Sequence, residues 1–144
     1  AAYGAVKKYS MPCIVCDFGT ATTIDAVNSK NEYLGGIITA GMNLLADSLH
    51  QRTSKLPKIE LRKPEKVIGD STISAIQAGV YYGYLGLVDG IITRMISEMN
   101  EKPKVIATGG LVNLICETSE MIKINDETLM LDGLRLIYES LEKK

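Results

Sequence analysis

The sequence carries no excess charge of either sign. Sixteen Lys and Arg residues balance 17 Asp and Glu residues, which leaves a formal net charge of -1. This balance gives no electrostatic basis for binding nucleic acid or an anionic membrane, because both need a basic surface. The longest apolar stretches are broken by Gly, Asp or Lys, so none predicts a transmembrane helix. We therefore expect a globular protein that binds neither nucleic acid nor a membrane.

Cysteine and histidine are also scarce, with three cysteines and one histidine among the 144 residues. An odd cysteine count without a signal-peptide pattern predicts a reduced, cytoplasmic protein. Cys13 and Cys16 have C-x-x-C spacing, but an offset of three along a strand places them on opposite faces. We therefore expect buried small side chains there, not a redox or zinc pair. His50 has no nucleophile near it in the sequence and is expected on a helix surface.

The length favours one domain with a substantial core. The first ten residues, "AAYGAVKKYS", have the character of a helix tail, as if the helix began earlier. We therefore expect residues 11–144 to form a domain that is the second half of a larger protein.

Apolar and β-branched runs predict three strands, at 12–19, 21–28 and 33–41, which would form an antiparallel meander. Further along the chain, the pattern alternates between helix and strand. The expected elements are a helix at 42–52, a short strand near 59–61, a long helix at 71–99, a strand into a turn at 103–110, a short helix at 110–119, a strand at 121–126 and a C-terminal helix at 127–144. This order predicts an α/β domain of ribonuclease H-like layout.

One stretch, "CDFGTATTID" at 16–25, carries a carboxylate at a strand end followed by a Gly-Thr turn. A carboxylate in this position can hold a cation, and the backbone N–H groups and hydroxyls of the turn can bind a phosphate. Glycine lets the backbone approach an anion closely. A hairpin with an Asx-type turn and ordinary strand threonines explains the same stretch equally well.

A second stretch, "VIATGGL" at 105–111, is an apolar strand that ends in Thr-Gly-Gly and leads into a helix. Such a junction brings backbone amides to a ligand at the helix N-terminus. A strand-to-helix turn that needs positive φ is the simpler alternative. Two glycine-threonine turns at strand ends within one small domain favour a ligand site.

Six blocks, in order, resemble the type III pantothenate kinases: "DFGTATTID", "LGGIITAG", "RTSKLP", "VIGDSTISAIQAGVYYG", "VIATGGL" and "LMLDGLRLIYE". This family belongs to the actin, hexokinase and Hsp70-like ATPases, which are built from two ribonuclease H-like halves, and the chain resembles the second half. The resemblance implies ATP-dependent phosphorylation of pantothenate to 4'-phosphopantothenate, the first step of coenzyme A synthesis. It also implies Mg²⁺ with ATP, a monovalent cation (K⁺ or NH₄⁺), a homodimer and an N-terminal half of the same enzyme as partners.

The resemblance also implies roles for individual residues. The second phosphate motif of the family corresponds to Asp17, Gly19, Thr20 and Thr22, with Asp17 near the monovalent cation. The adenosine motif corresponds to Thr108, Gly109 and Gly110. Thr53, in "RTSKLP", corresponds to a threonine that reaches pantothenate, across a dimer interface. The sequence departs from the family at Ala40, where a proline is usual, and this change removes no ligand.

Two motifs of the family are missing from the 144 residues. They are the Asp-x-Gly-Asn-Thr phosphate motif and the Gly-x-Asp-Arg block, which supplies the general base and is expected upstream of Ala1. We therefore assign the base to no Asp in this chain and expect the chain alone to be inactive. The alternatives are an acetate- or sugar-kinase-like ATPase and a non-catalytic regulator on the same fold.

The long helix contains Gly79, Gly83, Gly86 and Gly90, whose spacing places them on one face. Each glycine costs about 0.8–1 kcal/mol relative to Ala in a helix interior. We therefore expect the close approach of another backbone, supplied by a second subunit. The alternative is a central helix buried within one chain.

Overall fold

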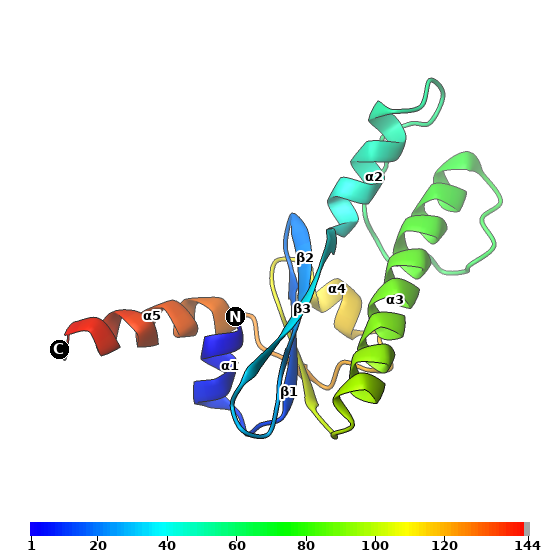
Figure 1. Ribbon diagram of the computed structural model, residues 1–144. Coiled ribbons are helices and arrows are strands. Elements are labelled where there is room, and N and C mark those ends of the chain that lie inside the picture. Colours follow the sequence, from blue (N-terminus) through cyan, green and yellow to red (C-terminus); the bar gives the residue numbers. More distant parts are fainter. Residues whose placement is uncertain (143–144) are drawn as a thin grey trace.

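A five-stranded mixed sheet forms the centre of the molecule in the computed structural model, which describes residues 1–142 (Figure 1). The strands lie in the order β3-β2-β1-β4-β5. Along the chain, the elements are α1 (Ala2–Lys8), β1 (Cys13–Phe18), β2 (Ala21–Val27), β3 (Tyr33–Ala40), α2 (Met42–Gln51), α3 (Thr72–Met99), β4 (Lys104–Thr108), α4 (Val112–Cys116), β5 (Ile124–Asn125) and α5 (Leu129–Glu142). None of the described helices is long and apolar enough to cross a membrane.

The sheet joins an antiparallel half to a parallel half. β1, β2 and β3 form the predicted antiparallel meander. β4 then pairs in parallel with β1, and β5 pairs in parallel with β4. The long helix α3 makes the connection between the antiparallel and parallel halves, as parallel pairing requires. The predicted ribonuclease H-like α/β layout is therefore confirmed.

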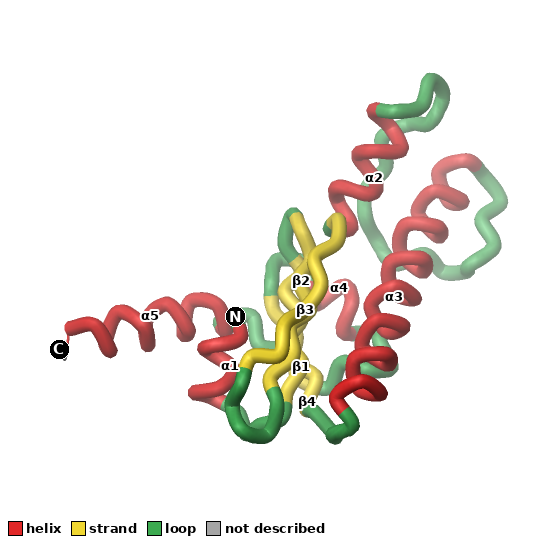
Figure 2. Tube along the Cα trace, viewed as in Figure 1, coloured by secondary structure: helices red, strands yellow, loops and turns green. Residues whose placement is uncertain are grey.

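Helices cover both faces of the sheet (Figure 2). Residues of α2, α3 and α4 pack on one face around Cys16, and residues of α1 and the first turn of α5 pack on the other around Cys13. Both cysteines are fully buried. The prediction that they point to opposite faces is confirmed. Burial raises the pKa of the Cys13 thiol to about 11 and raises that of Cys16 further, so neither thiol is activated at neutral pH.

The predicted start of the long helix is confirmed, because Ser71 is the N-cap of α3. Its hydroxyl accepts the backbone N–H of Ser74, and the Ser74 hydroxyl accepts the backbone N–H of Ser71. This reciprocal capping satisfies two donors that the first turn would otherwise leave free. The helix ends at Asn100, which adopts the left-handed conformation (φ 52°).

The glycine face of α3 is not covered by any other part of residues 1–142. Gly79, Gly83 and Gly86 are exposed, and a Cβ built on any of them would meet no atom within 4 Å. At Gly90 the nearest atom is the Arg94 guanidinium, at 3.3 Å. Within residues 1–142, α3 is therefore not buried on all sides, and burial of its glycine face within a longer subunit stays an alternative to a dimer contact.

Two predicted strands differ from the structure. The strand near 59–61 is wrong: this segment packs against α3, and the Gln77 side chain donates to the Glu60 carbonyl that a neighbouring strand would have used. The strand predicted at 121–126 shrinks to β5, because the Ser119 hydroxyl accepts the N–H groups of Met121 and Ile122. Residues 143–144 of the predicted C-terminal helix lie outside the described residues.

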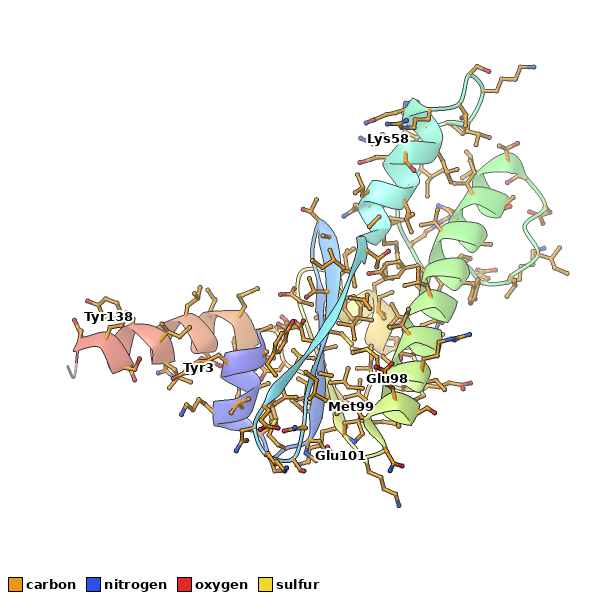
Figure 3. The ribbon with its side chains drawn as sticks, viewed as in Figure 1. Tyr3, Lys58, Glu98, Met99, Glu101 and Tyr138 are labelled. Atoms are coloured by element: carbon orange, nitrogen blue, oxygen red, sulfur yellow. The ribbon has the colours of Figure 1, made fainter. Side chains whose placement is uncertain are left out.

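The helices α1 and α5 cross closely at two glycines. A Cβ on Gly4 would come within 2.7 Å of the Leu129 carbonyl oxygen and 3.1 Å of the Gly133 Cα. Beyond this crossing α5 extends away from the sheet, and Tyr138 lies on its outer part (Figure 3). Residues 1–10 contain the helix α1, whose crossing with α5 closes the second face of the sheet, and its being the tail of a longer helix stays a prediction.

Candidate functional site

Asp17 lies where β1 ends, beside the last residue of β4. The strand register pairs Asp17 with Thr108 on β4 and with Thr23 on β2. Register partners project from the same face of a sheet, so these three side chains form a row across three strands. The row combines one half-buried carboxylate with two hydroxyls.

The Thr108 hydroxyl is the exceptional member of this row. Thr108 is 1% exposed, and its Oγ1 atom has no hydrogen-bond partner within the described part of the chain. Buried polar side chains nearly always have a partner, so an orphaned hydroxyl needs an explanation. A ligand or water bound beside Asp17 would provide one.

The Gly19-Thr20 turn of the β1–β2 hairpin is held by the start of α2. The Gly41 N–H donates to the Thr20 carbonyl at 2.9 Å. A Cβ at Gly41 would collide with the carbonyl oxygens of both Gly19 and Thr20, so the contact requires glycine at this position. Ala40, where the family usually has proline, pairs in regular register with Ala21 as the last residue of β3.

The turn after β4 crosses the end of β1 at close range. Gly109 has a φ of +101°, and a Cβ there would lie 2.6 Å from the backbone nitrogen of Phe18. The next residue, Gly110, is exposed, with nothing within 4 Å of its Cβ position. The predicted strand–glycine–helix junction is therefore present, although α4 has only five residues and contributes little dipole.

Thr22 lies on the opposite face of the sheet from Asp17. It is fully buried, and its hydroxyl forms a hydrogen bond with the Tyr84 hydroxyl on α3. Thr23, which no motif singled out, is the threonine beside Asp17. The two-residue period of a strand predicts that Thr22 and Thr23 diverge, but the hairpin register was needed to decide which of them faces Asp17.

Thr53 lies apart from these residues. Its hydroxyl donates to the Leu49 carbonyl at 2.5 Å in the exposed turn that ends α2. The ten residues of α2 separate it from the hairpin, and a helix of that length spans roughly 15 Å. Figure 3 labels Lys58 in the loop beyond α2, far from the sheet. Within one chain, Thr53 and Asp17 are not brought together.

Ala1, upstream of which the general base is expected, is not itself a site residue. It is the N-cap of α1, and it packs against the core cluster on the α1 face of the sheet. Ala1 therefore packs where α1 meets the start of α5, and a general base upstream of Ala1 stays a prediction.

The described residues contain no group of three or more His, Cys, Asp or Glu side chains that could hold a metal ion. A cation beside Asp17 would therefore need hydroxyl, carbonyl, water or ligand oxygens to complete its shell. The neighbouring Thr23 and Thr108 hydroxyls are oxygen donors of the type that hard cations accept. His50, predicted on a helix surface, is exposed on α2, where its Nδ1 contacts the Leu56 carbonyl.

An open groove of about 720 Å³ lies between α2 and α3. Its lining is mostly apolar and includes Leu45 and Leu49 from α2 and Gly79, Gly83 and Tyr84 from α3. The groove therefore lies along the uncovered glycine face and ends against the tyrosine that holds Thr22.

Comparison with known proteins identifies the sequence family. The profile of the type III pantothenate kinases matches residues 1–94. The type III pantothenate kinase of Koribacter versatilis is 52% identical over 135 residues, which cover 94% of this chain and 49% of the relative. That of Desulforapulum autotrophicum is 53% identical over 139 residues, which cover 96% and 53%. The chain thus spans about half the length of these curated relatives.

Solved structures share the fold at lower sequence identity. A crystal structure from Campylobacter jejuni, described as a conserved putative Baf family transcriptional activator, aligns with 99% of this chain and 63% of its own (TM-score 0.69, 20% identity). The ethanolamine utilization protein EutJ from Carboxydothermus hydrogenoformans aligns with 92% and 51% (TM-score 0.55, 16% identity). With a profile match over residues 1–94 and relatives that are about half identical across nearly all of its length, the chain belongs to the type III pantothenate kinase family.

Proposed function

We propose that the complete enzyme transfers the γ-phosphoryl group of ATP to pantothenate, forming 4'-phosphopantothenate in the first step of coenzyme A synthesis. This chain would supply one wall of the nucleotide site. The observation that carries the proposal is the row formed by Asp17, Thr23 and Thr108 with its orphaned buried hydroxyl, in a chain about half identical to kinases of this family.

Each turn of the site has a proposed role. Gly19 and Thr20 bind the phosphates of ATP, and Asp17 holds K⁺ or NH₄⁺ beside them. Thr108, Gly109 and Gly110 form the adenosine side. Thr22 belongs to the phosphate motif, but its hydroxyl faces α3. It therefore supports ATP binding indirectly, by fixing the hairpin through its hydrogen bond with Tyr84.

The proposed chemistry depends on positioning and charge neutralisation. Phosphoryl transfer spreads negative charge over the phosphate oxygens, which Mg²⁺ bound with ATP and a cation at Asp17 would offset. None of the aspartates in this chain is proposed as the general base. That role belongs to the Gly-x-Asp-Arg block expected upstream of Ala1, which these 144 residues do not contain.

We further propose that the enzyme is a homodimer. Support comes from the exposed Gly79, Gly83 and Gly86 and from the apolar groove beside them. Contact of Thr53 with pantothenate stays a prediction, and it would require the second subunit, since Thr53 lies far from Asp17 in its own chain. The three free cysteines agree with a reducing, cytoplasmic location.

The test is Asp17→Asn in the complete enzyme, assayed for pantothenate-dependent ADP formation over a potassium titration. The amide cannot neutralise a cation, so activity and its response to potassium should both fall. Asp25→Asn is the matched control, because Asp25 lies on β2, where its Oδ1 accepts the Tyr33 hydroxyl, away from the strand end. Equal potassium curves for Asp17→Asn and wild type would refute the cation assignment.

The same assay separates the alternative functions. An acetate- or sugar-kinase-like ATPase would form ADP with acetate or a sugar and not with pantothenate. A non-catalytic regulator would form none with any of these substrates.

A further inference from the structure

Tyr84 connects α3 to the β1–β2 hairpin, on the face of the sheet opposite Asp17. Its hydroxyl bonds to the Thr22 hydroxyl, and its ring packs edge-on against Phe18, with ring centroids 6.2 Å apart. Phe18 and Thr22 are register partners on the two strands of the hairpin. One side chain therefore holds both strands next to the Gly19-Thr20 turn.

This attachment has no duplicate within residues 1–142. No other side-chain hydrogen bond in that range joins the β1–β2 hairpin to a helix, and neither hydroxyl has another partner there. Thr22 and Tyr84 are 0% and 2% exposed, so bulk water cannot replace a lost partner without local opening. The rotamer of Thr22 therefore depends on a single buried side-chain bond, which adds to the backbone hydrogen bond that the Gly41 N–H donates to the Thr20 carbonyl at the turn.

We propose that Tyr84 is a positioning residue for the nucleotide: through Thr22 it fixes the hairpin turn that binds the phosphates of ATP, while touching no substrate itself. The proposal rests on the proposed function, because ATP binding at the hairpin is part of it. Without the Tyr84 hydroxyl, Thr22 becomes a second orphaned buried hydroxyl, and the hairpin must shift or admit water to satisfy it. Small displacements of positioning groups lower activity strongly.

The test is Tyr84→Phe in the complete enzyme. The KM for ATP should rise by up to roughly 150-fold, which is the limit reached when the full cost of an unsatisfied buried hydroxyl falls on the ATP-bound state, and the KM for pantothenate should stay unchanged. Tyr82→Phe is the matched control, since it removes a hydroxyl from the same helix that donates instead to the Pro64 carbonyl. Tyr82→Phe should leave the KM for ATP at the wild-type value.

A double variant examines the pair directly. If the two hydroxyls act only through each other, Thr22→Val combined with Tyr84→Phe should raise the KM for ATP no further than Thr22→Val alone. Additive effects would mean that Thr22 contacts ATP independently, and they would overturn the proposal. So would a Tyr84→Phe enzyme with a lower melting temperature and unchanged KM for ATP, because that result describes a purely structural bond.

Failure of the proposed function has a different signature. The wild-type enzyme would then form no ADP in the presence of pantothenate, and the role of Tyr84 would be overturned with it. A wild-type enzyme that is active, with Tyr84→Phe and Tyr82→Phe kinetically identical, would overturn the role of Tyr84 alone.

Discussion

Asp17 and Thr108 are register partners on parallel strands, and the carboxylate of one lies beside the orphaned hydroxyl of the other. The two residues belong to the first and fourth strands, so the site exists only where the two halves of the sheet meet. The predictions below test that junction, the crossing of α1 with α5, and the uncovered face of α3.

Replacing Thr108 with Val should have opposite effects on stability and on ligand binding. The buried hydroxyl costs about 1–3 kcal/mol while it lacks a partner, so the nucleotide-free protein should melt at a higher temperature. ATP should bind more weakly if ATP satisfies that hydroxyl. Calorimetry of unfolding and of ATP binding measures both. The control is Thr118→Val, which removes a hydroxyl bonded to Tyr81 and should lower the melting temperature. A Thr108→Val protein with a lower melting temperature would contradict the absence of a hydrogen-bond partner for the Thr108 hydroxyl.

Gly109→Ala should destabilise the protein far more than Gly110→Ala. At Gly109 a side chain meets both a positive φ and the backbone of Phe18, and the backbone strain alone is worth about 1–3 kcal/mol. At Gly110 the added methyl group meets nothing within 4 Å. Chemical denaturation of the two variants gives the comparison, and equal midpoints would exclude the close crossing over β1.

The loss of stability at low pH should depend on Asp126. Burial by itself raises the pKa of Asp126, but hydrogen bonds from Lys8 and Tyr9 outweigh it, so the pKa lies below its ordinary value. A depressed pKa contributes stability above the unfolded value, and that stability is lost as pH falls, roughly from pH 5 downward. Asp126→Asn should therefore flatten the decline in melting temperature over this range.

The matched variant for this measurement is Asp132→Asn. Hydrogen bonding to Lys8 also lowers the pKa of Asp132, but its side chain is 29% exposed, against 6% for Asp126. Solvent screening weakens exposed pairs, so Asp132→Asn should flatten the curve less. If the melting temperatures of wild type and Asp126→Asn fell equally as the pH was lowered, this role for Asp126 would be ruled out.

Gly83→Ala should change stability in opposite directions for one chain and for a dimer. In the single chain, nothing within the described residues crowds the new methyl group, so helix propensity predicts a gain of about 0.8–1 kcal/mol. In a dimer packed on this face, overpacking costs about 1–3 kcal/mol and should favour dissociation. Sedimentation together with thermal unfolding separates the two effects. An unchanged oligomer that melts higher would mean that the face is solvated in the enzyme.

The 144-residue chain alone should not phosphorylate pantothenate. It contains neither the first phosphate motif nor the block that supplies the base, so it can offer one wall of the nucleotide site and no proton acceptor for the hydroxyl. An ADP-coupled assay of the purified chain, with the complete enzyme as the positive control, measures this. Pantothenate-dependent ADP formation by the chain would refute it.

Most of the fold was predictable because local signals agreed with the global arrangement. β-branched runs predicted β1 to β3, and the long helix predicted at 71–99 corresponds to α3. The strand near 59–61 failed for a tertiary reason, since Ile59 and Leu61 pack against the core beneath α3 instead of joining a sheet edge. Apolar alternation indicates burial and does not identify the neighbour.

The site was predictable in its parts and not in its orientation. Asp17 and the two glycine turns follow from the motifs, whereas the division between Thr22 and Thr23 follows from hairpin register. Tyr84 carried no sequence signal of its own, because a tyrosine on an apolar helix usually only packs. Its hydrogen bond becomes visible when α3 is laid over the hairpin.

The parallel pairing of β1 with β4 has a consequence for how the protein folds. The hairpin of β1 and β2 needs only neighbouring residues, and such hairpins form in about 1–10 μs. Asp17 meets Thr108 only after α3 has folded back and a long loop has closed, a step whose entropy cost makes non-local pairing slow. In pulsed hydrogen exchange, the amides of β4 should therefore gain protection later than those of the hairpin. A nascent chain that ends before Lys104 would carry the phosphate turn without the strand that completes the site.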